Sequence, residues 1–281
     1  PSSLPLTLAV VMVIAGLLFK LGAVPFHMWV PDVYEGSATS TTLYLSAVPK
    51  LAAFAILLRL LVSGLGGWLE IWQDIILVAA VLSIGLGNII AIAQSNIKRM
   101  FAYSTISHMG FLLLGFSTAG ELGLSAAMMY TLIYMFTTLV AFGVILALSR
   151  PGFECDQLDD LRGLNRRNPL LALMMLVAMF SLAGIPPTAG FFAKLFVLEA
   201  ALEAGFIEIV VVAVLFAVVG AFYYLRIVKL MYFDDSSPHL LSASSYGYRP
   251  VVGWALGVNA LLLVLMIPWV GSIFNWLVAS L

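Results

Sequence analysis

The 281-residue chain is 63% hydrophobic and 10% charged, with a formal net charge of −1. A typical soluble domain carries about 25% charged residues, so the composition excludes a soluble globular protein, and the balanced charge provides no basic surface for nucleic acid. The single cysteine, Cys155, cannot hold an iron–sulfur cluster or close an internal disulfide, and no glycine-rich nucleotide motif is present.

Eight apolar runs are long enough to cross a bilayer, which takes about 20 residues each. The runs are 4–24, 39–62, 71–93, 97–116, 122–148, 169–201, 206–232 and 251–278. Only the connections 149–168 and 233–250 are long and polar. The sequence therefore predicts an all-α integral membrane protein with about eight transmembrane helices, some of them discontinuous, and no separate soluble domain.

Apart from Lys20, Lys50 and Lys194, the basic residues gather at alternate connections, and Arg59 is the exception. The residues on the basic side are Lys98, Arg99, Arg150, Arg162, Arg166, Arg167, Arg226, Lys229 and Arg249. The positive-inside rule assigns such connections to the cytoplasm. With an even number of spans, both ends of the chain are then expected on the outer side.

Three lysines lie inside apolar runs: Lys20 in GLLFKLGAVPF, Lys50 in SAVPKLAAF and Lys194 in GFFAKLFVL. A charge near the middle of a membrane helix costs roughly 2.5–3.5 kcal/mol, and such residues often mark ion pathways. We therefore take the three lysines as candidate proton-relay residues. The alternative is that their side chains extend to the membrane interface, as lysines near helix ends often do.

The run 169–201 is too long for one straight helix. From Pro169 to Glu199 a helix would extend about 46 Å, against an apolar core of about 30 Å. Within it, SLAGIPPTAGFF contains Pro186–Pro187, which remove amide donors. This pattern predicts a helix broken at membrane depth, where protein or water must satisfy the open backbone, with Lys194 two turns beyond. Comparable interruptions near the other lysines are expected at Gly22, Pro25 and Pro49.

Other polar side chains in the apolar runs allow two interpretations each. His108 in YSTISHMGF is either a proton carrier or a hydrogen-bonded packing residue. Tyr130, Tyr134 and Thr138, spaced four apart, favour helix–helix contact or a wet lining over a titrating site. A further acidic group, Glu199, Glu203 and Glu208, is either solvated or an exit for protons.

Four stretches carry a specific family resemblance. They are FKLGAVPFHMWVPDVYEGS, SAVPKLAAF, QSNIKRMFAYSTISHMGF and SLAGIPPTAGFFAKLFVLEAAL. With them the chain resembles the antiporter-like membrane subunits of respiratory complex I, the proton-pumping NADH:quinone oxidoreductase. The PDVYEGS form resembles the N-type family of bacteria, which has NADH dehydrogenase subunit 2 as its mitochondrial counterpart.

The resemblance implies fourteen helices with two inverted five-helix repeats. Residues 1–62 would then be the end of the first repeat, 71–232 the complete second repeat and 251–281 the C-terminal helix. Lys20, Lys50 and Lys194 match family lysines within their local motifs. The buried glutamate that pairs with the first of these belongs to an earlier helix that this chain lacks. A chain that begins with proline is also expected to be a fragment.

The function implied by the resemblance is proton translocation through buried lysines and water. NADH, FMN, iron–sulfur clusters and quinone would be bound by other subunits, and this chain would bind no cofactor or metal. Its expected partners are other membrane subunits, including antiporter-like neighbours, within the lipid bilayer of the bacterial inner (cytoplasmic) membrane. Two alternatives are a subunit of a multisubunit sodium/proton antiporter and a structural membrane subunit without transport.

Overall fold

The computed structural model describes residues 4–150, 152–236 and 250–280. Its helical elements follow in chain order: α1 Leu4–Leu21, α2 Trp29–Gly36, α3 Thr39–Leu57, the π-helix η1 Leu58–Gly64, the 3-10 turn η2 Gly66–Trp68, α4 Leu69–Ile92, α5 Ile97–Ser117, α6 Glu121–Leu148, η3 Leu158–Leu161, α7 Leu164–Arg167, α8 Pro169–Ala183, α9 Ala189–Glu203, α10 Ile207–Tyr232, α12 Pro250–Leu265, η4 Ile267–Trp269 and α13 Val270–Ser280. No β-strand forms within these described residues. The prediction of an all-α protein is confirmed.

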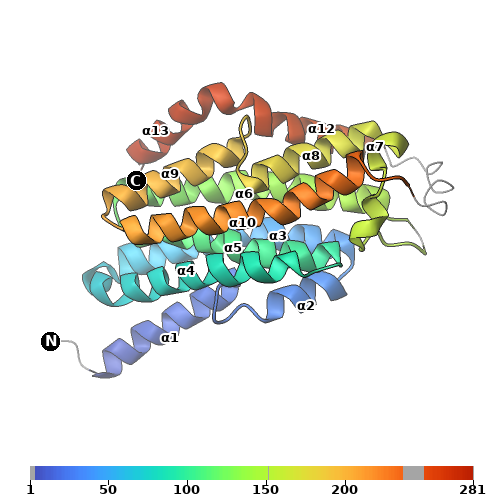
Figure 1. Ribbon diagram of the computed structural model, residues 1–281. Helices are drawn as coiled ribbons and strands as arrows, with labels where there is room; N and C mark the ends of the chain where they lie inside the picture. Colours follow the sequence, from blue (N-terminus) through green and yellow to red (C-terminus); the bar gives the residue numbers. More distant parts are fainter. Residues whose placement is uncertain (1–3, 151, 237–249, 281) are drawn as a thin grey trace.

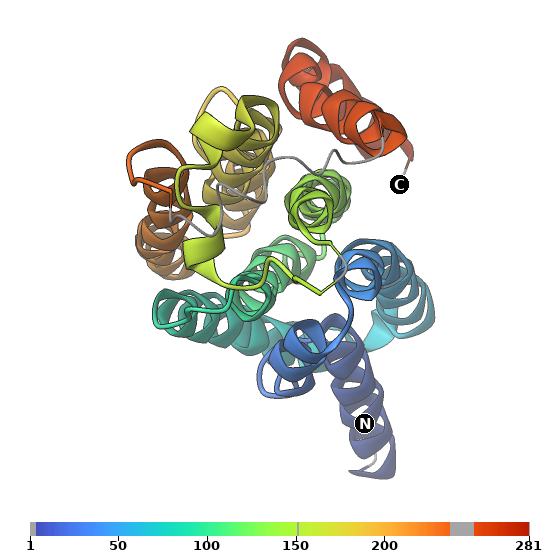
Figure 2. The ribbon, with the colours of Figure 1, turned by 90° about the vertical axis from the view of Figure 1, so that its right-hand side faces the viewer.

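The long helices form one bundle with their axes in roughly the same direction (Figure 1). Viewed end-on, α6 lies at the centre (Figure 2), where it contacts α3, α5, α8, α9 and α12. The helix α1 extends along one edge of the bundle, and α12 with α13 covers another (Figures 1 and 2). Functional side chains that point toward α6 are therefore shielded from the lipid by a ring of helices.

Five helices are long and apolar enough to cross a membrane, and the α12–α13 pair, bent by 48°, makes a sixth. The predicted count of eight adds α5 and the α8–α9 pair. Neither of these additions meets the criterion of length and apolar composition, and each fails it for a physical reason. Helix α5 contains charged and hydroxyl side chains among its apolar ones, while α8 and α9 are only 15 residues each.

The polarity of α5 is tolerated because this helix is enclosed. Every residue of α5 except Arg99 and Tyr103 is buried. Glycines let its neighbour approach closely: a Cβ at Gly110 would lie 2.7 Å from the Ala80 carbonyl of α4. Small residues at such contacts are typical of helix pairs in membranes. Helix α5 is therefore a core element whose polar groups face protein rather than lipid.

Two breaks interrupt the bundle where the sequence predicts them. Helix α1 ends at Leu21, and the chain continues as the short amphipathic helix α2. Helix α8 ends at Ala183, and α9 starts at Ala189. Helix α3, by contrast, runs through Pro49 and changes its hydrogen bonding only at Leu58, where the π-helix begins.

Candidate functional site

Lys194 reaches back across the break between α8 and α9. Its Nζ donates to the carbonyl oxygens of Leu182 and Ala183, both at 2.9 Å, and lies 5.2 Å from the centroid of the Phe111 ring. The last carbonyls of a helix have no partner within that helix, and a cation at this end also interacts favourably with the helix dipole. The break in α8 therefore creates the binding site for the Lys194 amine.

The amine of Lys50, on α3, makes the same kind of contact at the other break. Its side chain is buried, with 2% exposure, and its Nζ donates to the Leu21 carbonyl at the end of α1 at 2.6 Å. The Trp29 ring lies beneath it, 5.7 Å from Nζ to the centroid, within the range of a cation–π contact. Lys50 therefore does not extend to the membrane interface.

The two breaks share a local design. Gly22 and Gly184 both adopt positive φ angles, 78° and 80°, which a residue without Cβ adopts at little cost. A proline follows each glycine three residues later, at Pro25 and Pro187. Each left-handed turn ends a helix and leaves its last carbonyls free to accept a hydrogen bond from a lysine.

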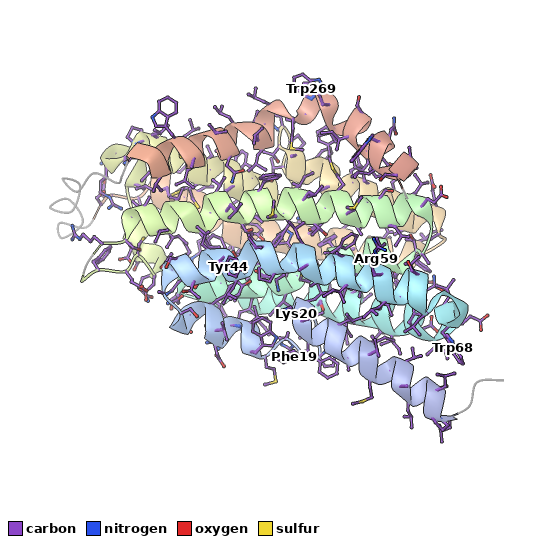
Figure 3. All side chains as sticks on the ribbon, turned by 180° about the vertical axis from the view of Figure 1, so that it is seen from behind. Phe19, Lys20, Tyr44, Arg59, Trp68 and Trp269 are labelled. Carbon is purple, nitrogen blue, oxygen red and sulfur yellow. The ribbon has the colours of Figure 1, made fainter. Side chains whose placement is uncertain are left out.

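Lys20 has a different environment from the other two lysines. It lies in the last turn of α1 and is exposed on the side of the bundle shown in Figure 3. Among the described residues it donates no hydrogen bond and forms no ion pair, although it is close enough to Lys50 to act on it electrostatically. The structure thus brings Lys20 near Lys50 and leaves its amine facing outward.

His108 lies in the middle of α5 and is hydrogen-bonded at both ring nitrogens. Nδ1 is 2.6 Å from the Tyr130 hydroxyl of α6, and Nε2 is 2.9 Å from the Tyr224 hydroxyl of α10. Tyr134 donates to Thr105 on α5 at 2.8 Å, whereas Thr138 bonds only to backbone within α6. The predicted polar stripe of α6 thus contributes two tyrosines that join α6 to α5.

A cavity connects His108 with Lys194. It leaves about 10 Å³ for the centres of water molecules, which is near the lower limit for holding one water. Its lining residues are His108, Tyr130, Ile133, Tyr134, Thr137, Ser181, Leu182, Gly190, Ala193 and Lys194. Two predicted site residues therefore line one cavity, and Glu199, Glu203 and Glu208 are exposed residues outside it.

The basic side chains at the start of α5 are held by hydrogen bonds and ion pairs that the sequence alone does not predict. Lys98 is buried and donates to Glu154 at 2.9 Å and to the Ser37 carbonyl at 3.0 Å. Arg99 pairs with Asp32 at 2.8 Å and Glu35 at 2.7 Å. These contacts fix α2 and the connection 149–168 against α5. Arg249, also counted on the basic side, lies outside the described residues.

Helix α10 contributes polar side chains to the site that the sequence did not predict. The Ser104 hydroxyl lies 2.5 Å from the Tyr224 hydroxyl. The adjacent Tyr223 donates to Asn88 Oδ1 at 2.9 Å, and Asn88 donates to Ser107 at 2.8 Å. The available signal was the pair of tyrosines in an otherwise apolar run, but nothing in their spacing shows which helix they face.

The connection 149–168 is packed against the bundle and has its own perturbed groups. Burial raises the pKa of the Cys155 thiol well above its ordinary value, so the thiol is protonated at neutral pH and is a poor nucleophile. Burial also lowers the pKa of the Arg167 guanidinium. Within the described part of the chain, no three His, Cys, Asp or Glu side chains are placed to share a metal ion.

The fold and site together define a class: a multi-pass membrane protein of antiporter-like architecture, with cations at the ends of interrupted helices. The family described as "NADH:quinone oxidoreductase/Mrp antiporter, TM" matches residues 1–220. Because this match covers more than half of the sequence, the chain belongs to that family.

Three similar proteins illustrate the relationship. NADH-quinone oxidoreductase subunit N of Thiobacillus denitrificans is 60% identical over 238 residues, which are 84% of this chain and 49% of that protein. A chain in the structure of respiratory complex I from Thermus thermophilus with bound aureothin is 33% identical with a TM-score of 0.82. This match covers 98% of the present chain and 60% of the other. A chain of the Mrp complex from Dietzia sp. is 25% identical with a TM-score of 0.83. This match covers 100% of the present chain and 60% of the other.

The present chain spans about half the length of the curated relatives it matches. The relatives' names therefore describe proteins about twice as long. Over the residues that align, the present chain shares the family and the fold of these proteins.

Proposed function

We propose that this chain acts as part of a proton-translocating membrane subunit of NADH:quinone oxidoreductase, of the N type. The names of relatives 60% and 55% identical to it support this proposal. The observation that carries it is the cavity shared by His108 and Lys194 at a helix break. A protonatable amine beside a cavity of about the size of one water, inside an apolar bundle, has the properties of a proton-relay site.

In this proposal the chain itself carries out no redox step. NADH, FMN, iron–sulfur clusters and quinone belong to other subunits, and their electron transfer drives the proton movement here. Lys20 is the site whose proton affinity responds to an acidic partner. Lys50 passes protons laterally toward the second repeat, and Lys194 passes them to the outer side with His108 as an intermediate.

The proposed partner of Lys20 lies outside the described residues. An exposed amine on an apolar helix needs a counter-charge when the helix is in the membrane. A carboxylate on a neighbouring membrane helix would supply it. Residues 1–62 would then complete a first repeat, while 71–232 form the second and 251–281 a final helix.

The proposed location is the inner (cytoplasmic) membrane of a bacterium, among antiporter-like and other membrane subunits of the complex. The connections that carry Lys98, Arg99 and Arg166 would face the cytoplasm. Both ends of the chain would then lie on the outer side. This orientation places the Glu199 end of α9 at the side where protons leave.

Replacement of Lys194 in the assembled complex tests the proposed function. In Lys194→Ala we expect NADH:quinone turnover and proton uptake into membrane vesicles to fall together, by on the order of 10²-fold if proton transfer becomes limiting. The matched control is Lys229→Ala, because that amine is exposed and its nearest carboxylate is 4.0 Å away. Normal pumping by an assembled Lys194→Ala complex would overturn the proposal.

One alternative function has an observation in its favour. The fold superposes on a subunit of an Mrp complex with a TM-score of 0.83 and on one of complex I with 0.82. Sodium/proton exchange is therefore the second candidate. Exchange of sodium for protons in vesicles without NADH and quinone would support it. A structural subunit without transport would instead tolerate simultaneous loss of Lys20, Lys50 and Lys194.

A further inference from the structure

His108 is held by two tyrosines from opposite sides of α5. Tyr130 and Tyr224 are both buried, with 2% exposure each, and their hydroxyls engage different ring nitrogens. A neutral imidazole has one N–H donor and one acceptor nitrogen. One tyrosine must therefore donate to the ring while the other accepts from it.

The Tyr224 side of this arrangement continues beyond the ring. The Tyr224 hydroxyl is 2.5 Å from Ser104 Oγ, and either oxygen can be the donor. Ser104, Tyr224, His108 and Tyr130 therefore form a hydrogen-bonded row, which we name the α10 row. Each member can both donate and accept a hydrogen bond, so the row has two consistent directions of donation.

The ends of the α10 row lie in different surroundings. Tyr130 lines the cavity that contains Lys194. Ser104 lies four residues nearer the start of α5, or about 6 Å along the helix axis, on the side of Lys98 and Arg99. The row therefore starts at a buried serine on the basic side of His108 and ends at the Lys194 cavity.

We infer that the Tyr224 hydroxyl is a proton-relay group that supplies the Lys194 cavity from the basic end of α5. This inference rests on the proposed function. It adds a residue of α10 that supplies protons to the Lys194 cavity within the same coupled path, after the lateral transfer through Lys50.

The proton balance of the α10 row is complete. In one direction Ser104 donates to Tyr224, Tyr224 to Nε2 of His108, and Nδ1–H to Tyr130. When a hydrated proton bonds to the Ser104 oxygen, the Ser104 hydrogen passes to Tyr224, that of Tyr224 to Nε2 and that of Nδ1 to Tyr130. Tyr130 releases its own hydrogen to the unprotonated Lys194 amine, which lines the same cavity. One proton is taken up and one leaves, and the row is restored when the hydroxyls reorient and rotation of the His108 ring returns an N–H to the Tyr130 side.

The neighbouring Tyr223 provides a matched control. It is as deeply buried as Tyr224 and also donates to a buried acceptor, Asn88 Oδ1. Its hydroxyl lies close to those of Tyr224 and Ser104 but takes part in none of the three hydrogen bonds that make up the α10 row. Tyr223→Phe therefore removes one buried hydroxyl from the same turn of α10, beside the row, and leaves all four members of the row in place.

The test compares Tyr224→Phe with Tyr223→Phe in the whole complex, after assembly has been verified. We expect coupled proton uptake and turnover to fall by about tenfold or more in Tyr224→Phe, toward the order of 10²-fold that loss of a positioned proton-transfer group costs. The turnover should also slow more in D₂O than that of the wild type, which a purely structural defect would not produce. Tyr223→Phe should match the wild type in both measurements.

Equal proton uptake and equal D₂O slowing in the two variants would overturn the inference. If Tyr224→Phe does not assemble, Ser104→Ala replaces it, because it removes the other end of the same hydrogen bond. Wild-type pumping by Ser104→Ala would then contradict the role of the row, and its loss would support that role. Lys194→Ala, measured in parallel, separates the two proposals: only its normal pumping counts against the proposed function itself.

Discussion

At the scale of single residues, the chain stabilises buried and half-buried cations in two different ways. Lys50 and Lys194 donate to neutral backbone carbonyls at helix ends. Lys98, also buried, has a carboxylate partner, Glu154, as well as a carbonyl. An amine that is held only by carbonyls can lose its proton without leaving an unpaired charge behind. The first arrangement suits a relay, and the second suits a permanent structural contact.

The Lys98–Glu154 pair yields a prediction about stability. Glu154→Ala leaves the Lys98 charge buried with only the Ser37 carbonyl, and we expect a cost near the lower end of the about 3–5 kcal/mol for breaking a buried pair, because Glu154 is half exposed. Lys98→Met instead leaves Glu154 free to be hydrated and should cost less. The midpoint of thermal inactivation of the assembled complex measures both, and a lower midpoint for Lys98→Met would contradict this explanation.

At the scale of elements, the interrupted helix α8–α9 depends on close backbone contact. A Cβ at Gly190 would overlap the Ser181 carbonyl of α8, so only glycine permits α9 to pack there. The Ser181 hydroxyl in turn lies 3.0 Å from the Thr137 hydroxyl of α6. This packing holds the open end of α8 beside Lys194.

Gly190→Ala tests the importance of that contact. Alanine would normally favour a helix by about 1 kcal/mol over glycine, but here the overlap with backbone should force α8 and α9 apart, at a cost of about 1–3 kcal/mol. We expect a lower thermal midpoint and reduced proton uptake. Gly67→Ala is the control, because a Cβ there meets nothing within 4 Å. A stabilised, fully active Gly190→Ala complex would refute the packing argument.

Most of the elements could be predicted from the sequence, because apolar runs, glycines and prolines act locally. The break at Pro186–Pro187 and the short helix after Lys20 are examples. The role of Tyr224 could not be predicted, since it depends on which face of α10 meets α5. The burial of Lys98 also depends on tertiary contacts: its partner Glu154 is 56 residues away.

At the scale of the whole molecule, polar groups lie around the central helix α6 and inside the bundle. The helices that carry Lys50 and Lys194, α3 and α9, both pack against this centre, and each lysine amine contacts the end of an interrupted helix. The proposed function requires both to act in one path. Groups that act in series lose their effects together, so their substitutions should not be additive.

The most direct test measures protons taken up per NADH oxidised in Lys50→Ala, Lys194→Ala and the double variant, in assembled complex in closed vesicles. A single path through both lysines predicts that the double variant pumps no worse than the poorer single variant. If the two losses multiply, or if either single variant pumps like the wild type, the lysines do not share one path and the central claim is wrong.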